Sequence, residues 1–336
     1  MFDTFKTQKE LASVFAPSGN EGELINRITE MAKPFADECR SDALGSLIIR
    51  KKGAGGGRRV MLSAHTDSIG LVVTHIDEKG FLRFCSVGGF RPPRIIGSTV
   101  VFARGAKGVV AAEEKCKIED IKPHDCYVDI GADSREAALK HVNIGDMAVF
   151  SADTYISGNR IISPYLDDRI GVVILLQVLS MASNPVNDIY FVFSAQEEVG
   201  LRGAKTAAYG IEPEVAIAVD VSGAGDMPGV KTPLNCALGG GAAIKIRDNS
   251  LLAHGGVVKW LENTANEGKI KYQRDVAAAG GTDAGAIHVS RAGVPSGVVS
   301  IPARYVHTNA EMADLSDIEA CTRLILAAIN SKVDFL

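Results

Sequence analysis

Apolar and polar positions alternate between strand-like and helix-like periods in two separated parts of the chain. In the first part, the spacing predicts helices over 4–15 and up to Pro34, and strands over 47–49 and 60–62. The alternation resumes near residue 161 and predicts strands over 188–193, 215–219 and 298–301, and helices over 170–181, 203–209, 251–267, 282–289 and after 316. We therefore expect an α/β fold.

The part between them has a different pattern. Short strand-like runs occur at 71–76, 81–85, 99–103, 109–111, 127–130 and 148–150, and glycine-containing turns separate them. Closely spaced short strands are typical of a small β-barrel or sandwich. The pattern thus predicts an α/β domain formed by 1–68 and 158–336, with a barrel domain, 69–157, inserted into it.

Three local patterns predict turns and caps. The glycine run 53–57 lacks the Gly-Lys-Ser/Thr of a phosphate loop, so it predicts a hairpin turn between the strands 47–49 and 60–62. Ser18 with Glu21, and Ser316 with Glu319, have the spacing of a capping box at a helix start.

Two adjacent glutamates, Glu197 and Glu198, follow the apolar run 188–193. Adjacent side chains on an extended chain point in opposite directions, so the two carboxylates are expected to have different tasks. One could hold a metal while the other moves a proton. On these residues alone, a solvated junction between strand and loop is an equally good interpretation.

Other metal-binding residue types also stand at element ends. His65 and Asp67 follow the strand 60–62 and share a face of an extended segment, so Asp67 could accept the hydrogen bond of the second ring nitrogen of His65. Asp220 ends the strand 215–219, and His307 follows the last strand. Asp167 precedes an apolar helix, where an acid also serves as an ordinary cap.

Together these positions supply two histidines and three acids at the edge of one sheet. A carboxylate shared by two metals, with one histidine and one acid beside each, is a recurrent arrangement in dinuclear hydrolases. Imidazole and carboxylate ligands without thiolate suit Zn²⁺, Co²⁺ or Mn²⁺.

Composition narrows the function classes. The 336 residues carry a net charge of −4 without basic blocks, which gives no indication of a nucleic-acid surface. The longest apolar run, 172–176, is far too short for a membrane span, and residues 1–16 are typical of an amphipathic helix rather than a signal. The six scattered cysteines form no CxxC pair, so we expect reduced thiols in a cytoplasmic protein.

Six motifs in this order resemble the M42 family of dinuclear metallo-aminopeptidases, the glutamyl and tetrahedral aminopeptidase group. They are Ser63-Ala64-His65-Thr66-Asp67, Leu166-Asp167-Asp168-Arg169, Gln196-Glu197-Glu198-Val199-Gly200, Val219-Asp220, Gly280-Gly281-Thr282-Asp283-Ala284 and Ile301-Pro302-Ala303-Arg304-Tyr305-Val306-His307. The resemblance spans nearly the whole chain. It implies a mixed-sheet α/β metallopeptidase core with an inserted barrel used in assembly.

The resemblance also implies a role for each matched residue. Two divalent ions, Zn²⁺ or Co²⁺ with Mn²⁺ as a further candidate, would be held by His65 and Asp220 on one side and by Glu198 and His307 on the other. Asp167 would bridge them, as the first acid of a pair joined by a cis peptide in related enzymes. Glu197 would be the general base, and Asp67 would orient His65.

Substrates and assembly are implied in the same way. The expected substrates are short peptides that lose N-terminal residues, and the expected assembly is a homo-oligomer built from dimers, up to a dodecamer. Apolar residues of the inserted block that look exposed, Phe90, Ile95 and Ile96, favour such an interface. Where many relatives have Gly-Lys-Gly-Pro, this chain has Gly239-Gly240-Gly241-Ala242. That loop lies near the substrate in such enzymes, so the preferred N-terminal residue stays open.

Three other functions compete with an aminopeptidase. A glycosidase needs two carboxyls on opposite sides of a sugar ring, and adjacent Glu197 and Glu198 could not straddle one. A metal-dependent deacylase would act on blocked amines instead of free ones. A non-catalytic assembly protein would not need so many ligand-type residues at strand ends.

Overall fold

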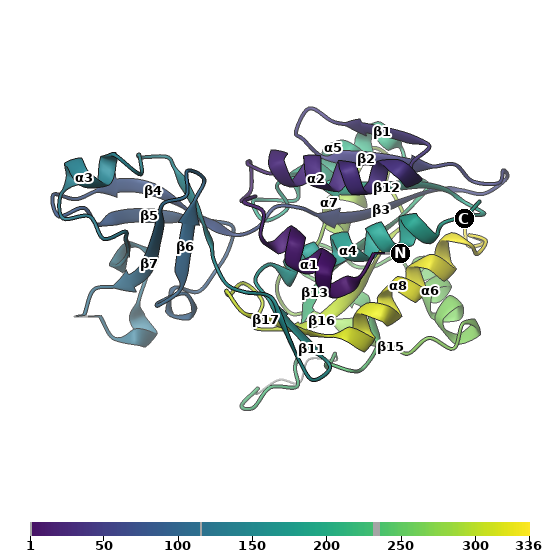
Figure 1. Ribbon diagram of the computed structural model, residues 1–336. Coiled ribbons are helices and arrows are strands. Elements are labelled where there is room, and N and C mark those ends of the chain that lie inside the picture. Colours follow the sequence, from purple (N-terminus) through teal and green to yellow (C-terminus); the bar gives the residue numbers. More distant parts are fainter. Residues whose placement is uncertain (1, 115, 231–235) are drawn as a thin grey trace.

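A computed structural model describes residues 2–114, 116–230 and 236–336, and it divides into a large α/β body and a smaller barrel beside it (Figure 1). Within the described residues the large sheet has eleven strands. They are β1 (Glu38–Ser41), β2 (Leu47–Lys51), β3 (Arg59–His65), β10 (Tyr155–Ser157), β11 (Arg160–Ser163), β12 (Asp188–Ser194), β13 (Val215–Gly223), β14 (Ala242–Arg247), β15 (Tyr272–Val276), β16 (Ser296–Arg304) and β17 (Glu311–Asp314).

The strand order brings the carboxyl ends of four strands to one edge of the sheet. It runs β1-β2-β12-β3-β13-β16-β17-β11-β10, and β14 pairs with both β15 and β16. The four neighbours β12, β3, β13 and β16 are mutually parallel, so their carboxyl ends lie at one edge. The predicted hairpin between β2 and β3 is wrong, because β12 lies between them and pairs with both. The hairpin of this region joins β1 and β2 instead.

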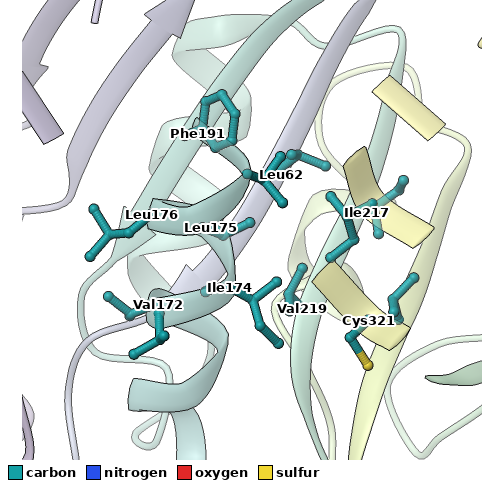
Figure 2. Close-up of a cluster of buried hydrophobic side chains, with 14 of the residues drawn as sticks. Leu62, Val172, Ile174, Leu175, Leu176, Phe191, Ile217, Val219 and Cys321 are labelled. Carbon is teal, nitrogen blue, oxygen red and sulfur yellow. The ribbon is translucent and has the colours of Figure 1, made fainter. Parts of the chain in front are cut away.

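Helices cover both faces of the sheet. They are α1 (Thr4–Ala12), α2 (Gly22–Ala32), α4 (Leu166–Met181), α5 (Arg202–Ile211), α6 (Gly255–Glu267), α7 (Ala284–Ile287) and α8 (Leu315–Ile329). The helix α4 is buried from Leu166 to Leu179, because it packs between the sheet and the helices α1, α2 and α8. Figure 2 shows Ile174 and Leu175 of this helix facing Ile217 and Val219 of β13. Helices α5 and α7 cover the opposite face.

The capping boxes predicted for two helices are wrong. Glu21 stands at the N-cap of α2 but makes no side-chain cap hydrogen bond there. At α8 the cap is Asp314, whose Oδ1 accepts the backbone N–H of Ser316 at 2.7 Å. Local spacing located the starts of the two helices, but it did not identify the groups that accept their free backbone N–H groups.

The inserted block forms a closed barrel in the order β4-β5-β8-β7-β6-β9. Its elements are β4 (Gly70–Ile76), β5 (Leu82–Val87), β6 (Thr99–Phe102), β7 (Lys107–Ala112), β8 (Cys126–Asp129), α3 (Arg135–Leu139) and β9 (Met147–Phe150). The barrel has its own core, and Ile95 is fully buried in it. Ile95 is therefore not the exposed residue that the pattern suggested. The division at 69–157 stays a prediction, and β10 at its end pairs with the large sheet.

The described part of the chain contains no helix that is both long and apolar enough to cross a membrane. Cys39, Cys85, Cys126, Cys236 and Cys321 carry free thiols.

Candidate active site

The carboxyl ends of the parallel strands bring the predicted residues to one cavity of about 760 Å³. His65 is the last residue of β3, and Asp220 lies in β13. Glu197 and Glu198 follow β12, His307 follows β16, and Asp167 opens α4. All six side chains line the cavity, whereas Asp67 lies behind it.

Asp167 stands between the two histidines. Its Oδ1 lies 3.0 Å from His65 Nε2, and its Oδ2 lies 3.1 Å from His307 Nε2. His307 Nε2 also lies 3.2 Å from Glu198 Oε1. One carboxylate therefore presents a separate oxygen to each of two imidazoles, which is the geometry of a shared ligand.

The peptide bond between Asp167 and Asp168 is cis, as the family resemblance implied. The carboxylate of Asp168 accepts the backbone N–H groups of His65 and Gly171, each at 3.2 Å. Ligand atoms of two groups lie within 4.8 Å of one another and could each hold a metal ion: His65, Asp167 and Glu198, and His65, Asp168 and Asp220. Asp168 is thus close to the cluster, but only Asp167 contacts both histidines.

The ring of His65 is oriented mainly by backbone. Its Nδ1 lies 3.1 Å from the carbonyl oxygen of Asp67 and 3.6 Å from the Asp67 carboxylate. In the neutral ring, the carbonyl contact assigns the proton to Nδ1 and leaves the lone pair of Nε2 directed at Asp167. The predicted hydrogen bond from His65 to the Asp67 carboxylate is therefore the longer of the two contacts.

The carboxylate of Asp67 instead holds the loop of the two glutamates. It accepts the backbone N–H groups of Glu197 at 2.9 Å and Glu198 at 3.1 Å, and the hydroxyl of Ser18 at 2.6 Å. Since both N–H groups donate to one carboxylate, the glutamates do not lie on an extended strand. The expected alternation of their side chains does not apply to this loop.

A second acid holds the same loop from the N-terminal segment. Glu21 Oε1 accepts the backbone N–H of Gln196 at 3.1 Å and that of Gly19 at 2.7 Å. Gln196 has a φ of 58°, which turns the chain where it leaves β12. Ser18 and Glu21 thus contribute to the site rather than to a helix cap.

Sequence reasoning missed Glu311 of β17. Its Oε2 accepts the backbone N–H of Asp167, and its Oε1 accepts that of His307, both at 2.8 Å. One buried carboxylate therefore fixes the backbone of two cluster residues from different elements. Asp283 was matched as a motif without a role, and it accepts the hydroxyls of Ser63 at 2.6 Å and Ser194 at 2.5 Å beneath the strand ends.

The cluster is rich in buried negative charge. Burial, followed by the charges of neighbouring acids, raises the pKa of Asp220 and Asp168 well above the usual range. Burial also raises the pKa of Glu197 well above its usual range. Burial and then the charge of Asp167 raise the pKa of Glu311 to about 8.

The pKa of each histidine is also raised, but by its carboxylate partners and not by burial. Burial favours the neutral ring of His307, but its contacts with Asp167 and Glu198 outweigh burial and raise its pKa. Among the described residues, no lysine or arginine forms an ion pair with the acids of this cluster. Buried carboxylates and imidazoles that converge without a cationic side chain are a donor set that fits divalent cations.

Comparisons with known proteins show the family of this chain. The M42 glutamyl aminopeptidase family matches residues 45–324. A protein of Acetivibrio thermocellus named "Putative aminopeptidase" is 46% identical over 97% of this chain and 98% of its own length. The lysyl aminopeptidase of Pyrococcus furiosus is 34% identical over 90% of each chain. The glutamyl aminopeptidase of Lactococcus lactis subsp. cremoris is 30% identical over 98% of each.

Solved structures show the same fold. An aminopeptidase of the archaeon Desulfurococcus kamchatkensis has a TM-score of 0.94 and 38% identity, over 98% of this chain and 94% of its own. The Pyrococcus horikoshii TET1 peptidase, which can assemble into a tetrahedron or a large octahedral shell, has a TM-score of 0.85 and 32% identity, over 97% and 99%. The family match and the relatives together show that this chain is an aminopeptidase and belongs to the M42 glutamyl aminopeptidase family.

Proposed function

We propose that this aminopeptidase holds two divalent ions and removes N-terminal residues from short peptides. His65 and Asp220 would hold one ion, Glu198 and His307 the other, and Asp167 would be shared. The observation that carries this proposal is the position of Asp167, with one oxygen 3.0 Å from His65 and the other 3.1 Å from His307.

When bound, the ions supply Lewis acidity for the scissile carbonyl and a water of lowered pKa. The chain supplies the proton transfer. Glu197 lines the cavity, and the closest ion pairs of the two histidines are with Asp167 and Glu198, so the Glu197 carboxylate is available to take a proton from the attacking water and pass it to the leaving amine. Burial raises the pKa of Glu197 well above its usual range, which supports a role in proton transfer.

The donor set supports three candidate ions. Two imidazoles and three carboxylates suit Zn²⁺ or Co²⁺, and Mn²⁺ is the further candidate. Glu311, Asp67 and Glu21 would hold the backbone of the ligand-bearing segments in place. Such outer hydrogen bonds typically set metal affinity and ligand orientation.

Metal content and turnover measured together test the proposal. Gently purified protein should contain two divalent ions per chain, and chelation should abolish release of p-nitroaniline from aminoacyl-p-nitroanilides. Returning Zn²⁺, Co²⁺ or Mn²⁺ should restore it. A protein that stays fully active after exhaustive chelation would exclude the dinuclear mechanism.

A comparison of substrates distinguishes the aminopeptidase from the competing hydrolases. The aminopeptidase should release product from peptides with a free amino terminus and leave N-acetylated peptides intact, whereas a deacylase would do the reverse. Carboxymethylcellulose should give no product. A profile over aminoacyl nitroanilides would identify the preferred N-terminal residue.

We also propose a homo-oligomer of dimers that reaches a dodecamer, in the cytoplasm. The assemblies of the TET1 peptidase support the oligomer, and the free thiols support the compartment. Light scattering with metal present should give a mass far above one chain. A one-chain mass at micromolar concentrations, with metal and without it, would contradict the assembly.

A further inference from the structure

The barrel reaches the active-site cavity through the loop that joins β5 to β6. Gly89 and Arg94 of this loop line the same cavity as the candidate metal ligands. Gly88, at φ +72°, lies so close to the site that an added Cβ would stand 3.2 Å from the Cβ of Glu198. The loop is therefore part of the wall of the active site, although it belongs to the barrel.

The backbone of Arg94 is held in one position. Two prolines begin the 3₁₀ turn η2 (Pro92–Arg94), and proline fixes φ. The N–H of Arg94 donates to the carbonyl of Arg91 at 2.9 Å, and the next residue, Ile95, is fully buried in the barrel core. A rigid turn lowers the backbone entropy that is lost when its side chain meets a ligand.

The guanidinium of Arg94 is an uncommitted cation in this cavity. The other cationic side chain of the lining, Lys245, donates to Asp275 at 2.6 Å and to Ser222 at 3.0 Å, and all three are buried. Arg94 is exposed. Of the lysine and arginine side chains that line the cavity within the described residues, Arg94 is the one without a hydrogen bond or ion pair.

The carboxylates of the cavity gather at the histidines, away from Arg94 in the chain. Asp167, Glu197, Glu198 and Asp220 surround the histidines, whereas Asp248 is committed to the hydroxyl and backbone of Ser250 and to neighbouring groups. The substrate of an aminopeptidase has a complementary distribution, since it carries a cationic amino group near the scissile bond. A short peptide also carries a carboxylate only one or two residues further on, at about 3.3–3.6 Å per residue.

We propose that Arg94 is a specificity-determining residue that binds a carboxylate on the leaving side of the scissile bond. This rests on the proposed function, because it assumes that the amino end lies at the acidic cluster. Guanidinium and carboxylate pair through two parallel hydrogen bonds, which an ammonium group cannot reproduce. A cavity of about 760 Å³ lies within the range that holds small ligands. The selected substrates are thus short peptides with a carboxylate near the cleaved bond.

That carboxylate has two sources: the C-terminus of a di- or tripeptide, and an acidic side chain after the scissile bond. Three dipeptide substrates separate them, all with the N-terminal residue that the nitroanilide profile prefers. The first ends in alanine with a free carboxylate, the second in alanine amide, and the third in aspartate amide. Tripeptides in free and amidated form extend the comparison by one residue.

The measurement is kcat/KM for each substrate with wild-type enzyme and with Arg94→Gln, Arg94→Lys and Arg91→Gln. Within each variant the alanine amide is the reference, so a general loss of activity cancels in the ratio. The free acid should be favoured over the amide by wild type, and Arg94→Gln should lower that ratio about tenfold, as expected for a charge-assisted hydrogen bond. Arg94→Lys should keep part of the preference because it keeps the charge.

Arg91→Gln is the matched control, since Arg91 is an exposed arginine of the same turn that does not line the cavity, and its ratio should equal that of wild type. An equal ratio in wild type and Arg94→Gln, for the free acids and for the aspartate amide, would overturn the inference. A preference confined to the aspartate amide would identify the acidic side chain as the source. Absence of nitroanilide turnover by metal-loaded wild type would instead contradict the proposed function.

Discussion

Two groups of buried charge lie in the wall of one cavity, and they are balanced in different ways. Lys245 and Asp275 form an ion pair at 2.6 Å, and Ser222 donates to the same carboxylate at 2.7 Å. The cluster around Asp167 has more carboxylates than imidazoles and no lysine or arginine partner among the described residues. The charges of the first group are balanced within the chain, whereas the second group has a surplus of acids over cationic partners. A surplus of buried acid is thus a better indication of a metal site than buried charge as such.

The largest expected effect separates the two central glutamates. Glu197→Gln keeps the size of the side chain and removes its basicity, so it should retain both ions and lower turnover by about 10²–10⁴-fold. Glu198→Gln should lose occupancy at one site, and added metal should restore part of its activity. Metal content and turnover are measured for both variants. Loss of metal from Glu197→Gln, with full occupancy in Glu198→Gln, would reverse the assignment.

Breaking the ion pair of Lys245 and Asp275 should lower the stability of the fold and leave metal binding unchanged. Asp275→Asn leaves the ammonium of Lys245 buried without its counter-charge, so the free energy of unfolding should fall by about 3–5 kcal/mol, with metal or without it. Urea unfolding measures this. The double change Lys245→Met with Asp275→Leu should recover most of the loss.

Glu262→Gln is the control for that experiment, because it breaks the more exposed pair with Arg274. It should change the free energy of unfolding by less than about 1 kcal/mol. An equal loss in Glu262→Gln and Asp275→Asn would show that burial of the Lys245 pair is not what matters.

The surplus of acids around Asp167 should make the free energy of unfolding depend on bound metal. An ion that binds only the folded chain adds about 2.7 kcal/mol at one hundred times its dissociation constant, so chelation should lower the unfolding midpoint of wild type. Glu198→Gln should show a smaller difference between loaded and chelated protein. Calorimetry at matched protein concentration measures both, and equal midpoints with and without metal would contradict the comparison.

The smallest expected effect concerns Asp67. Asp67→Asn replaces a carboxylate that accepts three hydrogen bonds by an amide with a single acceptor oxygen, so the loop of the two glutamates should loosen. We expect a loss of about 10–100-fold in metal affinity or turnover with the fold retained. Ser18→Ala removes one donor and should lose less. Competition with a chelator measures the metal affinity. Unchanged affinity and turnover in Asp67→Asn would show that the loop of the two glutamates keeps its conformation without the Asp67 carboxylate.

Periodicity and residue type predicted much of this protein, for a physical reason. A buried strand is mostly apolar, so an acid or histidine within it or just after it is conspicuous. The positions of His65, Asp220 and the two glutamates could therefore be recognised one element at a time, although β13 continues to Gly223 and does not end at Asp220 as predicted. The short apolar runs between turns predicted the strands of the barrel for the same reason. The ordered motifs then identified the M42 family, which the comparisons confirm.

Long-range partners could not be predicted from local spacing. Ser18 and Glu21 have the spacing of a capping box, yet their acceptor and donor are Asp67 and Gln196, far along the chain. Glu311 follows His307 by only a few positions, but nothing in that spacing shows that it also binds the backbone of Asp167. The place of β12 between β2 and β3 likewise depends on a crossover and not on the turn at 53–57.

The order of the cluster along the chain has a consequence for biosynthesis. His65 emerges from the ribosome first, the whole barrel follows, and Asp167, Glu198, Asp220 and His307 come afterwards, the last of them close to the C-terminal helix α8. Contacts this distant in sequence close late, because loop entropy opposes them until the sheet has formed. A nascent chain that stops before His307 would lack one of the two imidazoles beside Asp167. Metal loading would then be one of the last steps in making this enzyme, and premature peptide cleavage by a partly synthesised chain would be avoided.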